Sequence, residues 1–144
     1  MNSHQANPAV EAQHRTMLIL WFAFLMTIVM YFFLTFVIPR EDGASNRMLT
    51  IVFSAMSVFA VGVSFVVKKK FFARAIDEQQ LRLVNTGFIV AAALCEVGAL
   101  LGLLDFLVAL DRYYFLLMGV ALLGMLLHFP RRSDLEAASY KITS

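Results

Sequence analysis

Four long apolar runs constrain this chain more than any other feature. They occupy residues 16–38, 48–67, 84–104 and 113–129, and the third reaches residue 110 if Asp105 lies near the lipid headgroups. An α-helix rises about 1.5 Å per residue, so roughly 20 apolar residues cross a hydrocarbon layer of about 30 Å. Because 60% of the residues are hydrophobic and only 15% are charged, a soluble domain of this length could not bury them all. We therefore predict an integral membrane protein.

The apolar runs are continuous, whereas the strands of a membrane barrel alternate between lipid-facing and lumen-facing residues. The sequence therefore predicts an all-α fold, in which residues 1–144 form one membrane domain and a bundle of four transmembrane helices. The ends of the chain, residues 1–15 and 131–144, are polar and short. We expect them to be disordered or to dock on a partner.

Lysine and arginine in short loops tend to remain on the cytoplasmic side of a membrane. With four spans, both ends of the chain and the middle loop share one side, and three basic residues lie on the other: Arg40, Arg47 and Arg112. The shared side holds nine: Arg15, Lys68, Lys69, Lys70, Arg74, Arg82, Arg131, Arg132 and Lys141. This asymmetry predicts a multi-pass protein of the bacterial inner membrane with both termini in the cytoplasm.

The middle segment, residues 68–83, reads KKKFFARAIDEQQLRL. Its aromatic and aliphatic residues share one helical face, and Arg74 with Glu78 is an i,i+4 pair of opposite charge. We predict a cytoplasmic interfacial helix whose basic residues anchor the topology at the lipid headgroups, together with Arg131 and Arg132. A dedicated lipid or partner site is the alternative.

Small residues line one face of the third apolar run. At about 100° per residue, the face contains Gly87, Ala91, Cys95, Gly98 and Gly102. The Gly98 and Gly102 pair is a GxxxG step, which lets two helix backbones approach closely. We predict that the face packs inside the bundle, and a homodimer seam is the alternative.

Glu96 interrupts the same run on a different face. An ionised acid at that depth costs on the order of 3 kcal/mol, which favours the protonated carboxyl. Hydrogen-bond partners on the other runs include five hydroxyl groups: Thr27, Tyr31, Ser54, Ser57 and Ser64. Two interpretations stay open, namely an ion-binding site and a hydrogen bond of roughly 1 kcal/mol that holds the helices in register.

Residues 73–104, ARAIDEQQLRLVNTGFIVAAALCEVGALLGLL, resemble the polar loop and second helix of subunit c of rotary ATP synthases. The resemblance implies that Glu96 occupies the ion-binding position and that Arg74 is the loop arginine. It does not extend to the preceding helix, where that family has a glycine repeat and this chain has only Gly62. In overall plan the chain resembles small four-helix inner-membrane proteins of bacteria that have no assigned function.

Motifs of known enzyme classes are absent from the sequence, including the zinc-protease, nucleophile-elbow and phosphate-loop patterns, so we expect no catalytic or metal-ligating residues. A net charge of +2 gives no reason to expect nucleic acid. Haem bound between His14 and His128 is a minor alternative, because both lie at the cytoplasmic edge in the predicted topology. We therefore predict a non-enzymatic accessory, assembly or scaffold subunit that packs against a membrane partner or against itself. The second hypothesis is a proton or cation conductor that uses Glu96.

Overall fold

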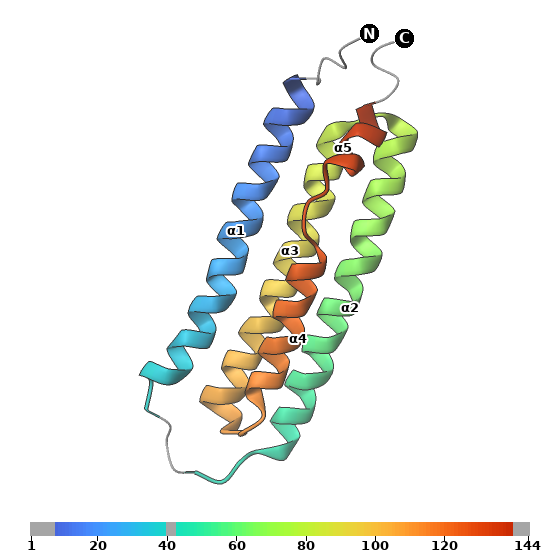
Figure 1. Cartoon of the computed structure of the whole chain (residues 1–144). Coiled ribbons are helices and arrows are strands. Elements are labelled where there is room, and N and C mark those ends of the chain that lie inside the picture. Colours follow the sequence, from blue (N-terminus) through green and yellow to red (C-terminus); the bar gives the residue numbers. More distant parts are fainter. Residues whose placement is uncertain (1–7, 40–42, 140–144) are drawn as a thin grey trace.

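The computed structural model describes residues 8–39 and 43–139, and these residues form an all-α fold. The α-helices are α1 (Pro8–Val37), α2 (Arg47–Glu78), α3 (Leu81–Leu104), α4 (Tyr114–Leu127) and α5 (Arg132–Ser139). Figure 1 shows the four longer helices side by side, with the short α5 at one end of the bundle. Arg40 and Lys141, which contribute to the predicted charge asymmetry, lie outside the described residues.

Three helical segments are long and apolar enough to cross a membrane: Pro8–Val37, Arg47–Glu78 and Leu81–Ala109. The fourth apolar run forms a helix of only 14 residues, which is about 21 Å long and shorter than a typical hydrocarbon core. It reaches spanning length only together with α5, and the pair is bent by 47°. The described chain thus has three candidate spans, or four with the bent pair, which indicates a multi-pass membrane protein.

α1 begins well before the apolar run that starts at residue 16. Its first residue is Pro8, and proline suits this position because the first amide groups of a helix have no partner within the helix. The helix ends at Val37, just before Ile38 and Pro39, because a residue that precedes proline is disfavoured in helical conformation. Residues 8–15, expected to be a disordered or docking tail, are therefore part of the first helix.

α2 differs from the prediction of a separate interfacial helix over residues 68–83. No glycine or proline interrupts these residues, and α2 continues through them to Glu78. Ala75 is fully buried, so the predicted apolar face packs partly within the protein, whereas Ile76 of the same face is 45% exposed. The helix ends where Gln79 adopts φ 55°, and its N–H group donates to the Ala75 carbonyl. The predicted ion pair is confirmed, with Arg74 Nε 2.5 Å from Glu78 Oε1.

The third apolar run continues as a helix beyond residue 104, towards the longer of its two predicted ends. A π-helical segment, Asp105–Ala109, continues α3, and the helix ends where Leu110 adopts φ 54°. The Asp105 side chain is fully buried within the protein, so its position near the lipid headgroups stays a prediction.

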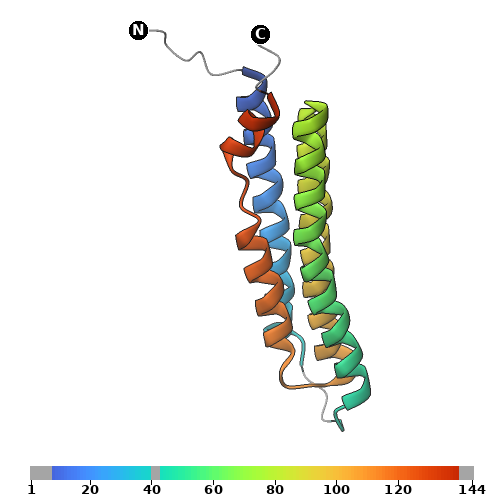
Figure 2. The same cartoon turned by 90° about the vertical axis from the view of Figure 1, so that its right-hand side faces the viewer.

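α3 is the central helix of the bundle. In its most apolar stretch 56% of the residues are buried, against 22% in α2 and 11% in α1. Figure 2 shows α2 and α3 in one layer, with α1, α4 and α5 in the other. A largely apolar cavity of about 290 Å³ lies between α1 and α4 and is bordered by Phe32 and Phe115, so these two helices pack less closely together than either packs on α3.

α5 packs on the bundle through one face. Leu135 and Ala138 are buried in a cluster with Val10, Met17 and Phe88, which joins α5 to α1 and α3. The second polar end of the chain thus docks on its own bundle over residues 132–139. Figure 1 shows α5, the start of α1 and the turn between α2 and α3 at the same end of the molecule.

Candidate functional site

Glu96 lies on α3, where it faces α1. The Tyr31 hydroxyl of α1 donates a hydrogen bond to Glu96 Oε1, with a separation of 3.3 Å between the oxygens. Both side chains are partly buried. The structure therefore selects Tyr31 from the hydroxyl groups that the sequence offered as partners, and the contact joins the central helix to the most exposed one.

Three of the other hydroxyl groups hydrogen-bond elsewhere. Ser57 donates to the Gly98 carbonyl at 3.0 Å and so joins α2 to α3. Ser64 donates to the Val61 carbonyl at 2.6 Å, and Thr27 donates to the Ala23 carbonyl at 3.1 Å, each within its own helix. Glu96 therefore receives one hydrogen bond from another helix, and this bond comes from Tyr31.

The face of small residues on α3 contacts other helices of the same chain. All five members are buried: Gly87, Ala91, Cys95, Gly98 and Gly102. A Cβ atom at Gly98 would lie 3.0 Å from Val61 Cγ2 of α2, and one at Gly102 would lie 2.8 Å from Met118 Cγ of α4. These positions need glycine because two helix neighbours approach α3 closely.

Asp105, the first residue of the π-helical segment that continues α3, is more deeply buried than Glu96. Its side chain has no exposed area, and the one side-chain hydroxyl that interacts with its carboxyl group among the described residues is that of Thr50 on α2. The neighbouring Thr50 hydroxyl donates to the Asn46 carbonyl of its own helix, over 3.4 Å. The sequence signal for its burial was a single acid inside the run LLDFLVAL. An exposed position near the headgroups explained this pattern as well as burial did.

The two histidines considered for haem contact separate carbonyl groups. His128 is buried, and its Nδ1 donates to the Gly124 carbonyl at 2.6 Å while the ring packs against Phe65. His14 Nε2 lies 3.4 Å from the Pro130 carbonyl. Among residues 8–39 and 43–139, no group of three or more His, Cys, Asp or Glu side chains is placed to hold a metal ion.

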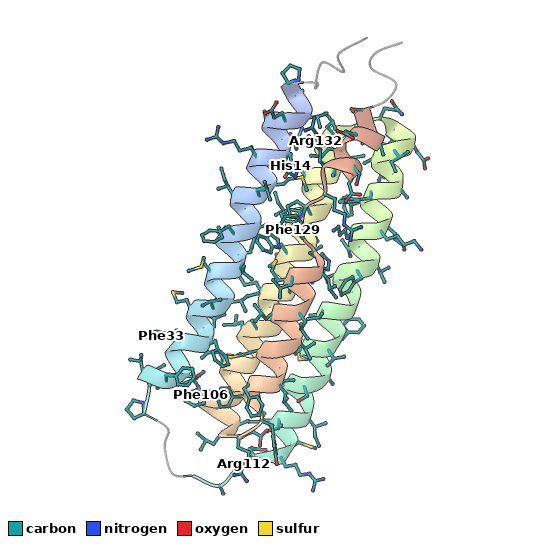
Figure 3. All side chains as sticks on the ribbon, in the orientation of Figure 1. His14, Phe33, Phe106, Arg112, Phe129 and Arg132 are labelled. Atoms are coloured by element: carbon teal, nitrogen blue, oxygen red, sulfur yellow. The ribbon has the colours of Figure 1, made fainter. Side chains whose placement is uncertain are left out.

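The six predicted anchor residues divide into two groups by position. Lys68, Lys69 and Arg131 border one cavity at the end of the bundle that carries α5, and the last two are exposed at its rim. Lys70, Arg74 and Arg132 are exposed outside it, and the last two form ion pairs within their own helices. Figure 3 places Arg132 and His14 at this end and Arg112 at the opposite end.

Comparison with protein-family models, with curated proteins and with solved structures finds no match for this chain.

Proposed function

We propose that this chain is a non-enzymatic inner-membrane protein that acts as an accessory, assembly or scaffold subunit. It crosses the membrane four times, with the run of residues 113–129, which contains α4, as the fourth crossing and both termini in the cytoplasm. The partner is another membrane protein or a second copy of the chain. The outer face of α1 is the surface that it binds.

The topology follows from where the chain places its basic residues. The start of α1, the turn between α2 and α3, and α5 lie at one end of the bundle (Figure 1). Eight of the described basic residues lie in or next to the segments that meet there: Arg15, Lys68, Lys69, Lys70, Arg74, Arg82, Arg131 and Arg132. Positive residues favour the cytoplasmic side, which supports a cytoplasmic position for this end.

The observation that carries the proposed role is the exposure of α1. Large side chains cover its outer face, and Phe33 and Phe36 are 63% and 71% exposed. Phe32 and Phe36 form an aromatic pair whose ring centroids are 5.4 Å apart. The small residues of α3, which would otherwise offer an association surface, are already used inside the bundle. α1 thus presents an exposed aromatic surface for a partner helix.

A proton or cation conductor is the second candidate, and the Tyr31–Glu96 pair is the observation that favours it. Conduction requires a chain of polar groups across the membrane. Along α3, Glu96 is separated from Asn85 and from Asp105 by roughly 16 and 13 Å at the rise of an α-helix. These gaps are too long for direct transfer between side chains, so we rank the subunit role first.

Photo-crosslinking tests the proposed surface. A photoreactive phenylalanine analogue replaces Phe33 on α1 or, as a matched control, Phe59 on α2, which is 70% exposed. We expect a discrete adduct from position 33 and none from position 59. An adduct of twice the 16.2 kDa chain mass identifies self-association, and a different mass identifies another protein. Equal diffuse labelling from both positions would show that α1 contacts lipid only.

Proton flux into liposomes tests the second candidate. Wild type and Glu96→Gln are compared under an imposed pH difference and membrane potential. The subunit role predicts no flux from either protein. It also predicts that the variant keeps its fold and its role, because glutamine keeps the hydrogen-bonding capacity of the site. Flux in wild type that disappears in the variant would establish conduction and overturn the subunit role.

A further inference from the structure

A cavity of about 280 Å³ lies where α2, the end of α4 and α5 meet. Lys68 and Lys69 reach it from α2, while Arg131 and Asp134 reach it from the segment that begins α5. Arg132, labelled in Figure 3, follows Arg131 and marks this end of the molecule. The cavity therefore collects charges from two segments that are far apart in the sequence.

The cavity has an excess of positive charge. Three cationic side chains border it, and Asp134 is its one acidic residue. Among the described residues, the ion pairs within 4.0 Å are Arg74–Glu78 and Arg132–Glu136, so neither of them neutralises a residue of the cavity. Cations held close together repel one another, and an anion between them relieves this repulsion. The cavity is thus matched to a negatively charged ligand.

Part of the cavity wall is apolar. Phe65, Phe72 and Leu127 border the same space, and the Lys68 ammonium group lies over the Phe72 ring, 5.3 Å from its centroid. Leu127 is the last residue of α4, and Lys68 directly follows the apolar run of residues 48–67. The cavity therefore lies where the apolar part of the bundle ends, at the depth of lipid headgroups in the proposed topology.

We propose that this cavity binds the phosphate group of one anionic phospholipid. Lys68, Lys69 and Arg131 bind the phosphate oxygens through charge-assisted hydrogen bonds. The Phe65 and Leu127 side chains contact the glycerol and the first methylene groups. A free phosphate ion would satisfy the cations but leave the apolar wall unused, which is why we commit to a lipid. This site rests on the proposed topology but not on the proposed subunit role.

Energy transfer from tryptophan to labelled lipid measures the binding. Trp21 is the chain's only tryptophan, and it packs on Phe129 beside the same end of α4, with 5.1 Å between ring centroids. The protein is reconstituted in phosphatidylcholine vesicles that contain a small fraction of pyrene-labelled phosphatidylglycerol or pyrene-labelled phosphatidylcholine. We expect wild type to transfer more energy to the anionic probe than to the zwitterionic one.

The cavity variant Lys68→Gln with Arg131→Gln tests the assignment. Each basic residue near an anionic lipid contributes a several-fold preference, so the double variant should lose on the order of tenfold in relative affinity for the anionic probe. The control is Lys70→Gln with Arg82→Gln, which removes the same charge from exposed residues outside the cavity. It should keep most of the preference. An equal loss in both variants would mean a general surface charge and overturn the site.

A charge-conserving variant and a competition with inorganic phosphate complete the test. The charge-conserving variant Lys68→Arg with Arg131→Lys should retain the preference for the anionic probe, and its failure to do so would overturn the assignment of these charges. Inorganic phosphate is then added to wild type at a concentration well above that of the labelled lipid. If wild type still prefers the anionic probe in the presence of phosphate, the result supports a lipid site. If the preference is lost, free phosphate is the ligand and the lipid assignment is overturned.

Discussion

α1 and α3 are almost equally apolar, yet they occupy opposite positions in the bundle. The most apolar stretch of α1 is 11% buried, and that of α3 is 56% buried. They differ in side-chain size, because α1 is rich in phenylalanine and methionine whereas α3 is rich in alanine and glycine. Lipid tails are as apolar as a leucine side chain, so apolarity alone drives no helix to the centre. Close approach of neighbouring helix backbones places α3 at the centre, and its small residues permit that approach.

The largest expected effect compares one residue type in the two helices. Phe88 of α3 is fully buried and Phe33 of α1 is 63% exposed. Phe88→Ala should destabilise the protein by about 3–5 kcal/mol, because it leaves a cavity in the core. Phe33→Ala should change stability by less than about 0.5 kcal/mol. Unfolding of each variant in mixed micelles with added denaturing detergent measures both. Similar losses would show that α1 packs as tightly as α3.

A second pair of variants compares crowded and open glycines. A Cβ atom at Gly87 of α3 would lie 2.4 Å from Phe71 Cβ of α2, whereas one at Gly62 of α2 would meet nothing within 4 Å. Gly87→Ala should cost about 1–3 kcal/mol, because neither backbone can withdraw without losing contacts. Gly62→Ala should be neutral or slightly stabilising. The same unfolding measurement applies, and a neutral Gly87→Ala would contradict the close contact between α2 and α3.

The third prediction separates the two acids of α3. Asp105 is fully buried and its carboxyl group interacts with the Thr50 hydroxyl, whereas Glu96 is only partly buried and receives one bond from Tyr31. Asp105→Leu should raise stability by about 1–3 kcal/mol, because burying a carboxyl group costs more than one hydroxyl contact returns. Glu96→Leu should not stabilise in this way, because it leaves the Tyr31 hydroxyl unpaired. A loss of stability in Asp105→Leu would show that the Thr50 contact outweighs the cost of burial.

The apolar runs and their helical nature could be predicted because they depend on local composition. The i,i+4 pair Arg74–Glu78 is local as well, and it is present. Tyr31 was one of five hydroxyl groups that could reach Glu96, and the choice among them required knowledge of which face of α1 meets α3. Periodicity places a residue on its own helix but does not say which neighbour it faces.

The features that the sequence did not predict depend on contacts between distant segments. The extension of α2 and the helix α5 are both polar at many positions, and each becomes ordered through a few buried residues such as Ala75 and Leu135. Asp105 is buried at the start of a π-helical turn. A single acid near the end of an apolar run is compatible with exposure and with burial, so only the packing of the neighbouring helices distinguishes them.

The smallest expected effect is at the contact that joins the two contrasted helices. Tyr31→Phe removes only the hydroxyl that donates to Glu96 Oε1, and such bonds between membrane helices contribute about 0.6 kcal/mol on average. Thr27→Val is the control, because the Thr27 hydroxyl donates within α1. A double-mutant cycle with Glu96→Leu should give a coupling of about 0.6 kcal/mol for Tyr31 and none for Thr27. A coupling well above 1 kcal/mol would mean that this hydrogen bond, and not side-chain size, holds α1 against α3. Zero coupling would mean that α1 is held on the bundle by the buried apolar residues of its inner face alone.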